Sequence, residues 1–233
     1  MRPGKHLSSL LFPRARCLCC NDPRHLVAGQ SLCPRCRDAL LEMKTSHLCC
    51  PRCLSFLNQE KACSFCARGG LSGIERAYAP FIYRDEARML VLRLKFGPFE
   101  EAGPPLAMAM AQAITGQGFD FLVPVPLYRD NLRERGFNQA ELLARMLQHH
   151  RPELPLLLAL EKTSKTRRQS SLGHEERFVN ARHKYRTVAN VSGKKLLLID
   201  DVRTTGATAQ DCARALKEAN AHSIRLLTAT VAA

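Results

Sequence analysis

The stretch that decides the fold is LLLIDDVRTTGAT, at residues 196–208. It begins with an apolar run, 196–199, which is typical of a strand that is buried on both faces of a parallel sheet. After a short turn, Cys212, Leu216 and Ala219 recur at the spacing of one helix face. A strand that leads through a small-residue turn into a helix predicts an α/β fold with a site at the turn.

The turn has the composition of a phosphate-binding loop. Backbone N–H groups and the positive end of the helix dipole attract anions, and threonine hydroxyls add donors. Just before the turn, Asp200 and Asp201 are costly to place together unless a cationic or hydroxyl-rich partner is present. A sugar diol with a nearby magnesium ion is such a partner, so the stretch predicts a site for a ribose with a 5-phosphate. The alternative is an ordinary strand–turn–helix with solvated acids. The expected phosphate-binding residues are Thr204, Thr205, Gly206, Ala207 and Thr208.

These residues resemble the phosphoribosyl pyrophosphate (PRPP) signature of the type I phosphoribosyltransferases, with Arg203 at a position that is often apolar. The resemblance implies an α/β fold of the type I phosphoribosyltransferase kind, a parallel sheet flanked by helices. It also implies that Asp200 and Asp201, as the catalytic pair, hold the ribose hydroxyls of PRPP directly or through water on a magnesium ion. Transferases of 6-oxopurines carry an acid where this chain has Thr204, which argues against that substrate class.

The charge favours an acidic partner. The chain of 233 residues has a formal net charge of +14, which suits phosphates, nucleic acid or a membrane surface. A basic solvated surface is the alternative. No stretch approaches the ~20 apolar residues of a transmembrane helix, so no membrane insertion is expected. The apolar stretch 7–12 is too short for a signal peptide. We therefore expect a cytoplasmic protein with reduced cysteines.

The N-terminal part contains four Cys-x-x-Cys units, which indicate metal binding in a reducing compartment. Each unit brings two thiolates to one tetrahedral zinc ion, and two units complete a closed structural site. Pairing the units in chain order predicts two zinc ions in a double zinc-ribbon module over residues 1–70. All ligands would be thiolates, which leaves no position for a catalytic water. The expected ligands are Cys17, Cys20, Cys33 and Cys36 for one ion, and Cys50, Cys53, Cys63 and Cys66 for the other.

Two neighbouring cysteines are alternative ligands. Cys19 could replace Cys20, but the residue after a zinc knuckle often needs a positive φ, which Asn21 tolerates, and this favours Cys20. The two-residue spacing likewise favours Cys50 over Cys49. Cys212 is predicted to be a small buried hydrophobic residue rather than a ligand.

A phosphoribosyltransferase-like domain is expected over residues 71–233. Its helices carry local signals: Asp85 is expected to N-cap a helix that ends near Gly97, and Pro104 or Pro105 to open a second helix over 106–114. The predicted strands, besides the one at 196–199, are 76–83, 119–123, 156–160 and 224–231, and Pro80 suggests that the first of these lies at an edge of the sheet.

The strand at 119–123 runs into Pro-Val-Pro at 124–126, and Arg-Gly-Phe-Asn-Gln follows at 135–139. Within the second motif, Asn138 and Glu141 predict an N-cap pair for a helix. Together the motifs are similar to the ComF/GntX family, competence-associated proteins that join cysteine-ribbon modules to a phosphoribosyltransferase-like domain. In the transferases the loop after this strand binds pyrophosphate, which the resemblance places at Val125, Pro126 and Arg129. A capped surface helix after a basic turn is the alternative.

A long polar stretch at 162–180 is dense in cations. A loop of this length in a compact domain is usually functional or disordered. In the transferases the corresponding loop closes over PRPP and excludes water, while its cations neutralise the leaving pyrophosphate. A solvated loop that binds nothing is the alternative. The residues expected to act in this flexible loop are Lys162, Lys165, Arg167, Arg168 and Gln169.

Two functions follow from the resemblance. In the first, the protein binds PRPP and transfers its phosphoribosyl group to an unidentified acceptor. In the second, it is a DNA-uptake factor that contacts single-stranded DNA, with other DNA-uptake proteins as partners and the PRPP fold as scaffold or sensor. The chain has no tryptophan and only 6% aromatic residues, so DNA contact would depend mainly on phosphates and would be sensitive to salt.

Overall fold

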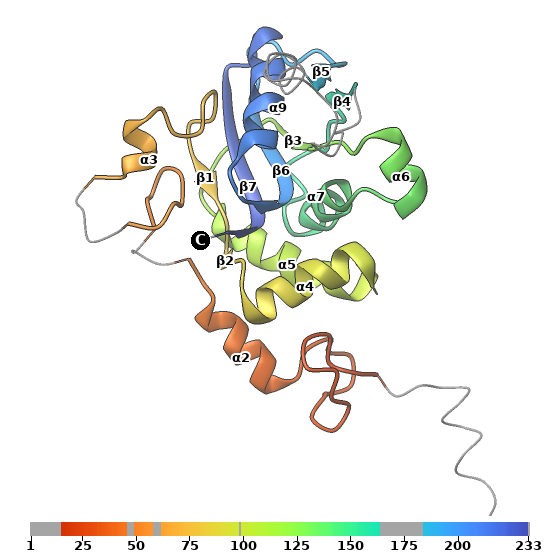
Figure 1. Ribbon diagram of the computed structural model, residues 1–233. Helices are drawn as coiled ribbons and strands as arrows, with labels where there is room; N and C mark the ends of the chain where they lie inside the picture. Colours follow the sequence, from red (N-terminus) through yellow and green to blue (C-terminus); the bar gives the residue numbers. More distant parts are fainter. Residues whose placement is uncertain (1–14, 46–48, 58–61, 98, 164–183, 233) are drawn as a thin grey trace, which may run out of the picture.

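The computed structural model describes residues 15–45, 49–57, 62–97, 99–163 and 184–232. Its main feature is a five-stranded parallel sheet flanked by helices, which confirms the predicted fold class (Figure 1). The strand order is β1-β7-β6-β3, and β2 also pairs with β7. The strands of this sheet are β1 Ala77–Tyr78, β2 Phe81–Ile82, β3 Phe121–Pro124, β6 Lys195–Arg203 and β7 Ser223–Val231.

Strand β6 lies in the centre of the sheet, between β3 and β7. Its side chains alternate between the two faces, as the pleat of a strand requires. Leu197 and Ile199 belong to a buried cluster with α4 (Asp85–Phe96), α5 (Phe99–Ala113) and α7 (Gln139–His150). Leu196 and Leu198 belong to a second cluster with α9 (Ala207–Glu218). All four side chains are fully buried, and each contributes about 1.5–3 kcal/mol through removal of apolar surface from water.

The cysteine-rich segments cover one edge of this sheet. Helices α2 (Pro34–Glu42) and α3 (Ser64–Ala67) belong to these segments. The backbone N–H of Ala77 donates to the carbonyl of Arg52 at 2.8 Å, and that of Ile82 donates to Met43 at 2.7 Å. Thr45 donates to the carbonyl of Pro80 at 3.0 Å. The edge formed by β1 and β2 is therefore paired instead of open, which blocks association with another strand.

Most of the strand predictions are confirmed, with changes at the ends. The strand expected at 76–83 is two short strands, β1 and β2, separated at Pro80, and they lie at the sheet edge as Pro80 suggested. The strand expected at 156–160 is wrong for the most part, because Leu156 forms only an isolated bridge with Leu122. The chain then enters β4 (Leu160–Lys162), which pairs antiparallel with β5 (Tyr185–Thr187) in a separate hairpin.

The helix starts were less predictable. Asp85 is the first residue of α4, and Arg84 holds the N-cap position. Helix α5 begins at Phe99, so Pro104 and Pro105 lie inside it instead of opening it. The reason is packing: Ala102 lies before the prolines and is fully buried, and its burial favours the helical conformation of this part of the chain. The Asn138 cap of α7 is confirmed, since its side chain accepts from the N–H of Ala140 at 3.1 Å. Helix α6 (Arg129–Arg135) was not predicted.

In the part of the chain that the structure describes, no helix has the length and apolar character needed to cross a membrane.

Candidate functional site: a phosphate loop beside two acids

The predicted phosphate loop (residues 204–208) joins the end of β6 to the start of α9. Gly206 adopts a left-handed conformation with φ of 83° and is the N-cap of the helix. The positive φ favours glycine, and a Cβ atom there would lie 2.4 Å from Leu71 Cδ2, so the Leu71 side chain would have to move. A small pocket lies at this turn, and its lining includes the whole phosphate loop, Asp200 and Arg203.

The start of α9 retains backbone donors for an anion. The N–H of Ala207 bonds to Thr205 Oγ1 at 3.3 Å, and that of Gln210 bonds to the carbonyl of Gly206 at 2.9 Å. Among the described residues, no hydrogen bond uses the N–H groups of Thr208 and Ala209. The first turn of the helix contains no acidic residue to compete with an anion. The loop thus has the donors and the dipole orientation of a phosphate site.

The two adjacent acids lie in different environments. Asp200 lines the pocket, and burial together with the charge of Asp201 raises its pKa well above the usual value. Asp201 is 7% exposed and forms an ion pair with Lys95 of α4. They are linked locally, because the N–H of Asp201 donates to Asp200 Oδ1 at 2.9 Å. Asp200 thus lines the pocket, whereas Asp201 has the ammonium group of Lys95 as its partner. That both acids hold the ribose hydroxyls of PRPP stays a prediction.

The residues expected at the pyrophosphate lie outside the lining of this pocket. Val125 is buried; its N–H donates to Ile199 at 2.9 Å, and its carbonyl accepts from Asn138 Nδ2 at 3.0 Å. Pro126 follows in the same loop. Arg129 is exposed and donates to Glu161 Oε1 at 3.2 Å. The β3 loop is thus fixed between β6 and α7, while the Arg129 side chain extends to the β4–β5 hairpin.

Of the five residues predicted to act in the flexible loop, one, Lys162, is among the described residues. Lys162 lies at the end of β4, with its ammonium 5.4 Å from the centre of the Tyr185 ring. Burial, with the charge of Lys184 as a second cause, lowers its pKa. Lys165, Arg167, Arg168 and Gln169 lie outside the described residues.

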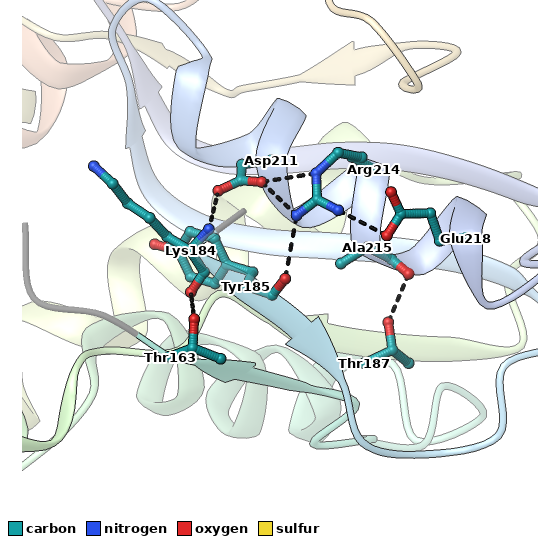
Figure 2. A network of polar contacts seen from close by, with 8 residues as sticks. All are labelled: Thr163, Lys184, Tyr185, Thr187, Asp211, Arg214, Ala215 and Glu218. Atoms are coloured by element: carbon teal, nitrogen blue, oxygen red, sulfur yellow. Dashed lines mark hydrogen bonds and ion pairs between the residues drawn. The ribbon is translucent and has the colours of Figure 1, made fainter. Parts of the chain in front are cut away.

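A polar network that the sequence did not reveal holds this hairpin on α9 (Figure 2). Asp211 accepts from the backbone N–H of Lys184 at 2.9 Å and from Arg214 Nη2 at 2.8 Å. Arg214 also donates to the carbonyl of Tyr185 at 3.3 Å. The helix that begins at the phosphate loop therefore also fixes the strands of the hairpin. The i, i+3 spacing of Asp211 and Arg214 was the available signal, but such pairs are common on solvated helix faces.

The cysteines form two groups of four, and these are the groups predicted from chain order. The first cysteine group is Cys17, Cys20, Cys33 and Cys36; the second cysteine group is Cys50, Cys53, Cys63 and Cys66. Within each group the ligand atoms lie within 4.8 Å of one another. Sulfur atoms are 3.8 Å apart for Cys20 and Cys33, and 3.6 Å apart for Cys53 and Cys63. Zn–S bonds of about 2.3 Å in a tetrahedron require sulfur separations of about 3.8 Å, so both groups fit zinc.

Local geometry repeats between the groups. Each combines a knuckle with the start of a helix, because Cys33 caps α2 and Cys63 caps α3. The residue after each knuckle, Asn21 or Leu54, has φ of 60°. The positive φ expected at Asn21 is confirmed. The first thiol in each group, Cys17 or Cys50, has a pKa lowered to about 7. Burial alone would raise this pKa, but hydrogen bonds from backbone N–H groups have the larger combined effect.

The remaining cysteines lie outside both groups. Cys19 donates to the carbonyl of Glu86 at 3.7 Å, and Cys49 is buried beside the second group. Cys212 is fully buried on α9, as expected of a small hydrophobic residue.

The match to a domain family gives the class of protein. The family described as "Phosphoribosyl transferase domain" matches residues 132–232, which contain β6, the phosphate loop and α9. Among solved structures, the allosteric regulatory enzyme of purine biosynthesis is 21% identical with a TM-score of 0.38, covering 54% of this chain and 24% of that one. A purine phosphoribosyltransferase from Pyrococcus horikoshii Ot3 is 16% identical with a TM-score of 0.36, covering 55% and 79%.

Similar proteins of known name indicate a more specific group within this class. Competence protein ComFC of Bacillus subtilis is 42% identical over 101 residues, which are 42% of this chain and 38% of the relative. DNA utilization protein YhgH of Salmonella typhimurium is 30% identical over 151 residues, 62% of this chain and 66% of the relative. Competence protein F of Haemophilus influenzae is 27% identical over 108 residues, 45% and 47%. The chain spans less than two thirds of the length of each relative. These matches confirm the resemblance to the ComF/GntX family.

Proposed function

We propose that this protein binds PRPP at the phosphate loop and Asp200, as a ComF-type phosphoribosyltransferase-like protein associated with DNA uptake. The observation that carries the proposal is the pocket at the start of α9, where Asp200 and all five residues of the phosphate loop line one cavity. A ribose 5-phosphate presents a dianion at one end and a diol at the other. The unused N–H groups suit the first, and a carboxylate suits the second.

The roles of the other predicted residues follow from their positions. Asp201, paired with Lys95, would act as a positioning residue, since a fixed Asp201 backbone N–H holds the Asp200 carboxylate. The loop around Val125, Pro126 and Arg129 would receive pyrophosphate at the carboxyl end of β3, with the Arg129 guanidinium as donor, because the Val125 N–H is bonded to Ile199 and proline has no N–H. Arg129 must leave Glu161 to do so, and Lys162 with the rest of its loop would supply further positive charge.

Magnesium would bind together with PRPP and would neutralise part of the charge of its pyrophosphate group. Asp200 would reach the ribose hydroxyls, directly or through a water on the ion. If the protein is an enzyme, a bond from the acceptor to C1 of the ribose forms while the bond from C1 to the pyrophosphate oxygen breaks, and pyrophosphate leaves with the electron pair. The site would lower this barrier by holding the reactants and by opposing the positive charge that develops on the sugar.

We further propose that the two cysteine groups hold one structural zinc ion each. The support is their sulfur spacing and the absence of any non-thiolate member in either group of the described residues. Zinc would supply much of the folding free energy of the short segments that carry them.

Isothermal titration of PRPP with magnesium tests the ligand proposal. Wild type is expected to bind, and Asp200→Ala/Asp201→Ala to lose binding because both the diol partner and its support are removed. Absence of binding to zinc-loaded wild type would refute the proposal. Pyrophosphate release in a screen of candidate bases would then separate an enzyme from a non-catalytic PRPP sensor.

A second candidate function is contact with single-stranded DNA. A groove between the first cysteine group and α4 is lined by three arginines and one tyrosine, together with two acidic residues: Arg35, Arg84, Arg88, Tyr83, Asp85 and Glu86. This arrangement, together with the net charge, suits a phosphate backbone with limited base stacking. Labelled oligonucleotides titrated across a salt series should bind wild type more tightly at low salt, and Arg35→Ala/Arg84→Ala/Arg88→Ala should show a shallower salt dependence. Equal salt slopes for the two proteins would exclude this groove.

A further inference from the structure

Arg203 is a charged side chain in a buried position. It is the last residue of β6 and is 6% exposed. Its Nη1 donates to the carbonyl of Thr204, the first residue of the phosphate loop, at 3.1 Å. Its Nε and Nη2 atoms are buried and have no hydrogen-bond partner among the described residues. A buried guanidinium without a compensating anion is strongly unfavourable, so the position calls for a negative group nearby.

The second cysteine group is the source of negative charge that we consider, because it packs in the same buried cluster as Leu71 and α9 and acts electrostatically on Arg203. Burial lowers the pKa of Arg203, and the charges of Cys53, Cys49 and Cys50 act in the opposite direction, as nearby anions do. A tetrathiolate zinc site is anionic overall, because four thiolate charges outweigh the two charges of the ion. Metal ligands are commonly oriented by such outer partners, which affect how tightly the metal is held.

Packing joins the second cysteine group to the phosphate loop by two further contacts. Leu71, five residues after Cys66, lies against Gly206 so closely that a Cβ on the glycine would displace the leucine side chain. The next residue, Ser72, donates its N–H to Gln210 Oε1 at 3.1 Å in the first turn of α9. The second group therefore shares one buried cluster with α9, whereas Cys17, Cys33 and Cys36 of the first group belong to the cluster on the other face of the sheet.

We propose that Arg203 is a positioning residue that couples the zinc-loaded second cysteine group to the phosphate loop. One side of the guanidinium balances the thiolates, and the other holds the carbonyl of Thr204, so the metal site and the loop are organised together. The coupling to ligand affinity rests on the proposed function, but the coupling to the metal does not. The rival role for Arg203 is direct contact with the bound phosphate, since it lines the same pocket.

The first experiment measures zinc release to a chelator from the full zinc-loaded chain. In Arg203→Met, one of the two ions is expected to leave about 10- to 100-fold faster than in wild type, as for loss of other outer partners of a metal site. Cys50→Ser/Cys53→Ser, which lacks the second site, identifies the ion concerned. Arg203→Lys keeps the charge and should restore most of the retention. The matched control is Arg35→Met, an exposed arginine between two ligands of the first group, which should leave the second ion unaffected.

The second experiment measures PRPP affinity with magnesium. Cys50→Ser/Cys53→Ser should weaken binding by about fivefold or more, in the usual range of coupling between sites, whereas Cys17→Ser/Cys20→Ser should not. Arg203→Met with unchanged zinc release but weaker PRPP binding would establish the rival role and overturn the coupling. Equal losses from the two cysteine variants would also overturn it. If wild type does not bind PRPP, the proposed function fails, and the zinc-release result alone decides whether Arg203 supports the metal site.

Discussion

Each face of the sheet has a cysteine group, a helix and one of the two adjacent acids, but the acids have different surroundings on the two faces. On one face, the first cysteine group packs with α4, and Lys95 of that helix pairs with Asp201. On the other face, the second cysteine group packs with α9, and Asp200 lines a pocket with the phosphate loop. Because neighbouring residues of a strand point to opposite faces, two adjacent acids can have separate roles. The first face stabilises the fold, and the second face is where we place the ligand.

Loss of a zinc site should have the largest effect on the stability of the fold. Apparent zinc-binding free energies in small metal-stabilised modules are about 10–16 kcal/mol. We expect Cys17→Ser/Cys20→Ser to increase amide hydrogen exchange mainly in α4, and Cys50→Ser/Cys53→Ser to increase it mainly in α9. Exchange that rises in both helices for either variant would show that the faces do not act separately.

Replacement of Lys95 by methionine tests the stabilising face. Removal of one partner of a buried ion pair leaves an uncompensated charge and costs about 3–5 kcal/mol. The free energy of unfolding of Lys95→Met, measured in urea, should fall by that amount, while additional replacement of Asp201 by asparagine should restore part of it. No restoration in the double variant would contradict the ion pair.

Gly206→Ala tests the ligand face and has a matched control in Gly193→Ala. Both glycines have positive φ, for which an alanine costs about 1–2 kcal/mol. Only at Gly206 would the new Cβ also meet another side chain, Leu71. We therefore expect a larger loss of stability at Gly206 and loss of PRPP binding at that position alone. Binding that survives in Gly206→Ala would argue against the phosphate loop.

Asp200→Asn tests whether the raised pKa of Asp200 lowers the stability of the folded protein at neutral pH. Burial raises the pKa of Asp200 in the folded state, so the folded protein binds its proton more tightly than the unfolded chain does. The unfolding free energy of wild type should then decrease as pH rises above 3.8, the ordinary value, towards the raised pKa. The asparagine variant lacks this decrease and should be more stable than wild type at neutral pH. Urea unfolding at pH 4 and pH 7 measures the difference. An equal pH dependence in both proteins would show that the pKa of Asp200 is not raised in the folded protein.

The smallest effect is expected in the hairpin network. Asp211→Asn weakens the contacts with Arg214 and Lys184, and a hydrogen bond to a charged group contributes about 1.5–3 kcal/mol at most. Exchange of the β5 amides should increase, with little change in global unfolding. Unchanged exchange in β5 would mean that the hairpin is held by other contacts.

Local signals in the sequence predicted the elements whose own residues determine them. The apolar run at 196–199, the Asn138 cap and the cysteine spacings each specify structure over a few residues, and each appears in the structure. The start of α5 could not be predicted because burial of Ala102 overrides the prolines. The different environments of Asp200 and Asp201 depend on Lys95, more than a hundred residues away. Sequence adjacency could not reveal that partner.

The most direct test is a calorimetric titration of PRPP and magnesium into zinc-loaded Asp200→Asn and Asp201→Asn, beside wild type. We expect wild type to bind and Asp200→Asn not to bind. Asp201→Asn should retain binding with reduced affinity, because it changes only the support of the neighbouring carboxylate. Equal loss in the two variants would contradict the separate roles of the two faces, and no binding by wild type would contradict the proposed ligand.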